Sequence, residues 1–95
     1  MICKTVFYTG RVQGVGFRFT TAELARRFIV AGYVMNLGDG RVRLEVQGSS
    51  DQVDGLLAAV DQAMAGNIKA KEIADRRADP ALGDPKAVYS FEIRR

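Results

Sequence analysis

The hydrophobic pattern of the chain changes its period several times. Residues 2–9 are rich in β-branched and aromatic residues, which predicts a strand. Arg41 to Gln47 alternates without a fault between polar and apolar residues, so we expect a strand with one buried and one exposed face. The same reasoning predicts three further strands, at 33–35, at 68 to about 77 and at 89–93.

Two other stretches have apolar residues at helical spacing. The first predicted helix begins at Phe17 and ends at Gly32, in the position where glycine often follows a helix. Ser49 and Gln52 form the sequence signature of a capping box, which predicts the start of the second helix, and Gly66 marks its end. The apolar stripes consist of Thr21, Leu24, Ala25 and Phe28 in the first helix, and of Val53, Leu56, Leu57, Val60 and Met64 in the second.

These elements follow one another as strand, helix, strand, strand, helix, strand, with an extra strand at the end. Residues 79–85, which contain two prolines and a glycine, form a predicted turn before that last strand. The order predicts an α+β, ferredoxin-like (βαββαβ) sandwich, in which an antiparallel sheet carries two helices on one face. No linker or repeat interrupts the chain, so we expect one domain over residues 1–95.

The predicted topology brings two segments together. In such a sandwich the first and second strands run parallel, on either side of the third, so their C-terminal ends lie at the same edge of the sheet. The glycine-rich loop 10–16 leaves the first strand at this edge, and Asn36 lies at the end of the second. We therefore expect the loop and Asn36 to be neighbours.

The composition narrows the possible chemistry. Apolar residues make up 47% of the chain, which is enough for a core without a metal or disulfide, and the single cysteine, Cys3, fits that core. The chain has no histidine, which excludes catalysis by a histidine base, and no two carboxylates have the spacing of a metal motif. We expect no signal peptide, no membrane span, a cytoplasmic location and a monomer.

The basic residues are distributed unevenly. A net charge of +3 is too small to indicate nucleic-acid binding by itself. However, no acidic residue precedes Glu23, whereas Lys4, Arg11 and Arg18 all do. The N-terminal quarter therefore has a local positive field that suits a small anion, and the alternative is an acid-free run that arises by chance.

The loop 10–16 connects a predicted strand to a predicted helix. Such a loop can turn main-chain N–H groups inward as an anion-binding nest, and the helix N-terminus adds donors and its positive dipole end. Arg18, in the first helical turn, can bind a phosphate through two hydrogen bonds. The glycine spacing matches neither a dinucleotide fingerprint nor a P-loop. The loop alone therefore leaves phosphate binding and a plain structural turn as equal alternatives.

Two motifs resemble those of a known family. The run GRVQGVGFR at residues 10–18 closely resembles the first signature of the acylphosphatases. GYVMN at 32–36, followed by GRV at 40–42 and by Gly48, resembles the second. The resemblance covers about residues 5–48, and FEIR at 91–94 resembles the final strand of the family.

The resemblance implies a function. The family hydrolyses the carboxyl–phosphate bond of small-molecule acyl phosphates, without a metal, a cofactor or a phosphoenzyme. It implies that Arg18 binds the substrate phosphate and that Asn36 positions the attacking water. The main-chain N–H groups implied to bind the phosphate are those of Gln13, Gly14, Val15, Gly16 and Phe17.

Simpler interpretations stay open beside this one. Arg18 is otherwise an ordinary surface arginine, and Asn36 a turn residue. An RNA-binding module would need exposed aromatic residues on the central strands, and residues 42–46 have none, so we expect no nucleic-acid partner. A non-catalytic anion-binding or regulatory acylphosphatase-like module would be expected to lack Arg18 or Asn36, yet fold never proves activity. The segment 66–88 is atypical of the family, which leaves the substrate preference undetermined.

Overall fold

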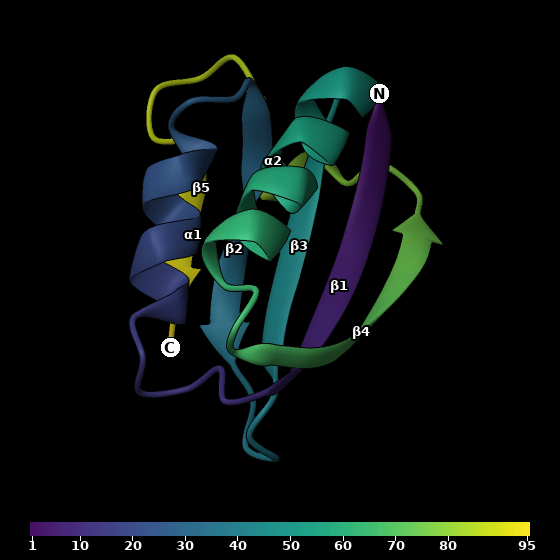
Figure 1. The fold of residues 1–95 in the computed structure, drawn as a ribbon. Helices are drawn as coiled ribbons and strands as arrows, with labels where there is room; N and C mark the ends of the chain where they lie inside the picture. The colour runs from purple at the N-terminus through teal and green to yellow at the C-terminus, as the bar shows by residue number, and fades with distance from the viewer.

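The computed structural model describes residues 1–95 as one five-stranded sheet with both α-helices on the same face (Figure 1). The strands pair in the spatial order β4-β1-β3-β2-β5. A short 3₁₀ helix, η1, lies between the last two strands in the chain. The elements are β1 (Ile2–Gly10), α1 (Phe17–Ala25), β2 (Val30–Asn36), β3 (Val42–Gly48), α2 (Ser50–Ala63), β4 (Ile68–Arg76), η1 (Pro80–Leu82) and β5 (Phe91–Arg94).

The predicted ferredoxin-like fold is confirmed. β3 pairs antiparallel with both β1 and β2, so these two strands run parallel and end at the same edge of the sheet. β5 pairs parallel with β2, which makes the complete sheet mixed, so the predicted antiparallel arrangement holds only for the first four strands. The reason is that β4 ends at the edge where β2 begins, and the chain crosses over and enters β5 from that same edge (Figure 1).

The core lies between the sheet and the two helices. The inward side of the sheet contributes the fully buried Val6, Val34 and Leu44, and α2 contributes Leu56 and Val60. Neither helix is long and apolar enough to cross a membrane. Burial of this continuous apolar layer holds the strand ends, and the loops that leave them, in fixed relative positions.

The prediction for the end of the first helix is wrong. α1 ends at Ala25 rather than at Gly32, because Arg27 and Phe28 donate to the carbonyls three residues earlier and turn the chain toward β2. Gly32 lies inside β2 with φ 152°. A Cβ there would lie 1.8 Å from the carbonyl oxygen of Glu45, so glycine is required by the close approach of β2 and β3.

Two further details differ from the sequence predictions. Ser49 is the N-cap residue of α2, but no capping box forms, because Gln52 Oε1 instead accepts a hydrogen bond of 2.8 Å from the Ile29 N–H. The last strand begins at Phe91 rather than at Tyr89, because Tyr89 has a left-handed backbone with φ 60°. The predicted second helix and the turn before β5 are confirmed.

Candidate active site

A small cavity lies at the edge where β1 and β2 end. Its volume is about 250 Å³, and Arg18 and Asn36 both line it. Gly14, Gly16 and Phe17 contribute the loop side of the wall. The two segments that topology was expected to bring together are thus neighbours in the structure. Of the loop residues predicted to bind phosphate, Gln13 and Val15 are not among those lining the cavity.

The loop between β1 and α1 has a backbone that glycine makes possible. Gly14 has φ 75°, and Gly16, the N-cap residue of α1, has φ 81° and ψ 18°. These left-handed values disfavour any residue with a Cβ. None of the main-chain N–H groups of residues 13–19 donates to another protein group, and Thr20 is the first to do so, to the Gly16 carbonyl at 2.9 Å. The loop and the first turn of α1 therefore offer a run of free donors.

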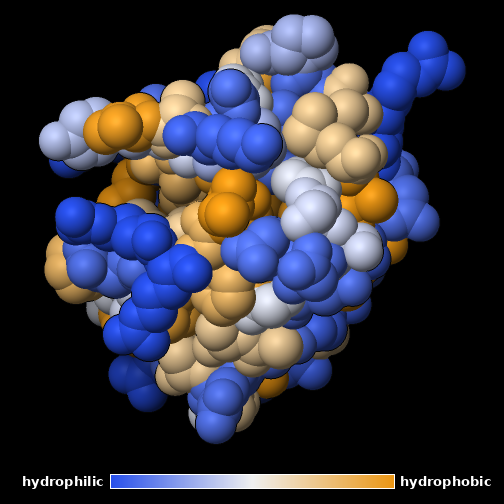
Figure 2. All heavy atoms as spheres, turned by 90° about the horizontal axis from the view of Figure 1, so that it is seen from above, coloured by the Kyte–Doolittle hydropathy of each residue, from blue (hydrophilic) through white to orange (hydrophobic).

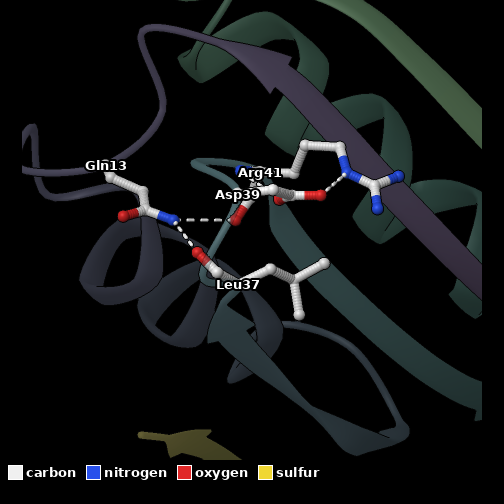
Figure 3. Close-up of polar contacts among 4 residues, drawn as sticks. All are labelled: Gln13, Leu37, Asp39 and Arg41. Atoms are coloured by element: carbon white, nitrogen blue, oxygen red, sulfur yellow. Dashed lines mark hydrogen bonds and ion pairs between the residues drawn. The ribbon is translucent and has the colours of Figure 1, made fainter.

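Two pairs of hydrogen bonds fix the loop to its surroundings. At its base, the Arg11 N–H donates to the Asn67 carbonyl at 2.9 Å, and Asn67 Nδ2 donates to the Arg11 carbonyl at 3.0 Å. Further along, Gln13 Nε2 donates to the carbonyls of Leu37 at 2.8 Å and Arg41 at 2.9 Å (Figure 3). Both carbonyls belong to the connection between β2 and β3, and Leu37 directly follows Asn36. Gln13 therefore ties the glycine loop to the segment that contains Asn36.

Arg18 is half-buried in the first turn of α1. It takes part in none of the ion pairs of the chain. The first turn of α1 contains no acidic residue, and the N-cap makes no side-chain hydrogen bond. The guanidinium charge and the positive end of the helix dipole therefore reinforce each other without a protein anion to compensate them. This arrangement favours a bound anion.

Asn36 is the last residue of β2 and faces Val42 across the β2–β3 ladder. It is half-buried, and its side-chain amide makes no hydrogen bond to the protein. Because the Asn36 backbone is held in the sheet, a rigid element presents its side-chain amide to the cavity. Both an oxygen acceptor and an N–H₂ donor are thus available to a ligand.

The connection that follows β2 has a rigid tip. Asp39 accepts hydrogen bonds from the Arg41 N–H at 3.0 Å and from Arg41 Nε at 2.8 Å. The main-chain bond, followed by the guanidinium bond, lowers the pKa of the Asp39 carboxyl below its usual range. Arg41 is therefore occupied by Asp39, and it also lies over the Phe7 ring at 4.8 Å, so it does not compete with Arg18 for an anion.

The sequence predictions missed two features of this site. The Gln13 side chain is its main polar brace, although the sequence indicated only a main-chain role for that residue. Ile93 and Arg95, from the C-terminal segment, also line the cavity. The only signal for Ile93 was its place in the predicted last strand, because nothing in the sequence indicated that β5 would pair beside β2.

Comparisons with known proteins agree on one family. The acylphosphatase family model matches residues 4–92. The acylphosphatase of Nostoc sp. strain PCC 7120 is 48% identical, and the match covers 100% of this chain and 88% of that protein. The acylphosphatase of Bifidobacterium longum is 53% identical over a shorter stretch, which is 60% of this chain and 59% of the relative. The crystal structure of acylphosphatase from Bacillus subtilis superposes with a TM-score of 0.80 at 25% identity, over 100% of both chains.

Proposed function

Because the chain belongs to the acylphosphatase family, we propose that it hydrolyses a small-molecule acyl phosphate to a carboxylate and inorganic phosphate. Family and fold support this activity, which is a hydrolase reaction on an acid anhydride. One observation carries the assignment of the site. A single cavity is lined by an uncompensated arginine, by a glycine loop with free N–H groups, and by an asparagine with a free amide.

In the proposed mechanism, the Arg18 guanidinium and the main-chain N–H groups of the loop bind the oxygens of the substrate phosphate. Their positive charge neutralises the charge on the phosphoryl group in the transition state. The Asn36 amide orients a water molecule for attack on phosphorus. The water oxygen forms the new P–O bond, the bond to the acyl oxygen breaks, and its electron pair leaves with the carboxylate.

Such a reaction needs little acid–base assistance. A carboxylate is a good leaving group, so no general acid has to protonate it, and a proton of the attacking water passes to a phosphate oxygen. Positioning and charge stabilisation then supply most of the acceleration. This fits a cavity that is lined by two arginines, Arg18 beside the loop and Arg95 in the C-terminal segment, and by no Asp or Glu side chain.

The experiment is benzoyl phosphate hydrolysis in the presence of EDTA. We expect Arg18→Ala to lower kcat/KM by about 10²–10³, the usual effect of removing one preorganised donor. We expect Asn36→Ala to lower kcat by a similar factor with a smaller change in KM, because it acts on the water. Arg11→Ala, an exposed cation of the same loop, is the matched control and should retain wild-type activity. Equal losses in the Arg11 and Arg18 variants would contradict the assignment.

The alternative is a non-catalytic module that binds an anion at the same loop. It predicts no turnover above background, together with calorimetric binding of inorganic phosphate that Arg18→Ala abolishes. Metal-independent turnover by the wild type excludes it. The cytoplasmic location, the monomeric state and the absence of a nucleic-acid partner stay predictions.

A further inference from the structure

Exposed apolar side chains gather on one side of the molecule. Of the seven large apolar residues that are exposed, five lie on α1, on the connection that follows it and on the segment that leads through β5, and the other two, Met1 and Ile73, lie elsewhere. The five are Phe19, Ile29, Val88, Tyr89 and Ile93. Isolated exposed apolar residues are normal on a protein surface, whereas a cluster of this kind marks a binding surface.

The cluster borders a large hollow between α1 and residues 85–91. Its volume is about 720 Å³, which lies within the usual range for small-molecule sites. Most of its lining side chains are apolar, among them Phe28, Pro85 and Phe91. Seen from above, the left side of Figure 2 shows apolar atoms in a recess between projecting hydrophilic side chains.

The hollow adjoins the cavity that Arg18 and Asn36 line. Ile93 of β5 lines both of them. On the helix side, Phe19 lines the cavity, and Ala22, Glu23 and Arg26 line the hollow. These four positions are spaced i, i+3, i+4 and i+7, so they form one face of α1. The cavity and the hollow therefore lie next to each other between this face of α1 and β5, and together they are called the groove.

We propose that this groove binds the acyl chain of the substrate, so that the enzyme prefers acyl phosphates with an uncharged, apolar acyl group larger than acetyl. The inference rests on the proposed function. A phosphate held by the loop and Arg18 has its acyl group pointing out of a cavity too small to enclose a long chain. Phe19 and Ile93 form the walls that such a chain meets first.

The helix wall of the hollow carries no net charge, which suits an uncharged chain. Arg26 Nη1 and Glu23 Oε1 are 3.7 Å apart, so the two charged residues of the helix wall neutralise each other. Lys86 also lines the hollow. The acyl group would pass over Ala22, the smallest side chain on this face, before it reaches Val88.

The test compares acetyl phosphate with hexanoyl phosphate. Each methylene group that is fully buried contributes a factor of about four in affinity, and an open groove covers only part of the chain. We expect the KM of the wild type for hexanoyl phosphate to be about tenfold lower than for acetyl phosphate. Ile93→Ser and Val88→Ser should each reduce this preference by about threefold. The matched control is Ile73→Ser, on the opposite edge strand, which should leave both the activity and the preference unchanged.

Equal KM values for the two substrates, with no effect of the groove variants, would overturn the inference and leave the proposed function standing. If neither substrate is hydrolysed, the proposed function fails. Calorimetry with hexylphosphonate and methylphosphonate then tests whether the groove binds an apolar chain. Equal affinities of the two phosphonates overturn the inference, and tighter binding of the longer one supports it. A dimer that Val88→Ser dissociates in sedimentation would show that a second copy occupies the groove, which also overturns the inference.

Discussion

Gln13→Met removes the amide that ties the glycine loop to the β2–β3 connection and keeps a side chain of similar length. Nothing in this change touches the cavity wall directly, because Gln13 is not a lining residue. The variant therefore separates the geometry of the site from its chemistry. If the brace sets the distance between the loop and Asn36, its loss should act on the reaction more than on the binding of phosphate.

The structure gives the size of the effect on stability. Two hydrogen bonds to the carbonyls of Leu37 and Arg41 are lost. Neither carbonyl is left without a partner, because the Gly40 N–H donates to Leu37 at 3.2 Å and the Leu37 N–H donates to Arg41 at 2.8 Å. The free energy of unfolding should thus fall by only about 1–2 kcal/mol, near the low end for two such bonds.

The effect on the reaction should be larger. A misplacement of about 1 Å can lower a rate by about 10²-fold, so we expect kcat for benzoyl phosphate to fall by about 10- to 100-fold. KM and the inhibition constant of inorganic phosphate should change by less than about threefold, since Arg18 and the loop N–H groups stay in place. The matched control is Gln62→Met, an exposed glutamine on α2, which should behave as the wild type.

Gln13→Glu tests whether the Gln13 side chain acts as a hydrogen-bond donor or only fills space. At neutral pH its carboxylate faces two carbonyl oxygens, so this variant should be less active than Gln13→Met. As the pH falls toward the pKa of this carboxyl group, the protonated acid donates one hydrogen bond, and kcat relative to the wild type should rise. If Gln13→Met keeps its kcat, or if the Glu variant shows no such recovery, the brace has no part in positioning the site.

Three further predictions concern the backbone and the core. Gly16→Ala should lower the affinity for phosphate, which calorimetry measures. It should also lower the free energy of unfolding by about 1 kcal/mol, which urea unfolding measures, because φ 81° disfavours a Cβ although space for one is available. Gly32→Ala should lower the free energy of unfolding by more than about 2 kcal/mol, because its Cβ would overlap the Glu45 carbonyl; normal urea stability would contradict the observed β2–β3 contact. Burial raises the pKa of Tyr8 above its ordinary value of 10.0. The contribution of Tyr8 to stability is therefore full below pH 10 and is lost as the pH rises beyond it, by about 1.4 kcal/mol per pH unit. Tyr8→Phe should flatten the fall of Tm between pH 10 and 11, whereas Tyr89→Phe, with an exposed hydroxyl, should not.

The sequence contained enough information for the fold and for the position of the site, because both depend on regular patterns. Alternation in residues 41–47 and the two helical stripes determined the element order, and the order determined the topology. The glycine loop and Asn36 then had to meet, since both follow strands that end at one edge. Errors arose where one residue serves two kinds of structure. Gly32 suits a helix end as well as a crowded strand, and only the close approach of β3, where a Cβ at Gly32 would lie 1.8 Å from the Glu45 carbonyl oxygen, decides between them.

The side-chain brace and the C-terminal wall were not predictable in the same way. Gln13 stands in a glycine-rich loop, and the partners of its side chain are main-chain carbonyls 24 and 28 residues away, which leave no mark in the sequence. The parallel pairing of β5 with β2 likewise depends on where the crossover re-enters the sheet. That pairing places Ile93 at the cavity, so the strand that the sequence defined least contributes to the wall that we propose faces the acyl group. On the proposed function, the residues that bind phosphate lie in one contiguous motif, whereas those that contact the acyl group are brought together by tertiary structure, so relatives that share the motif can differ in their preferred substrate.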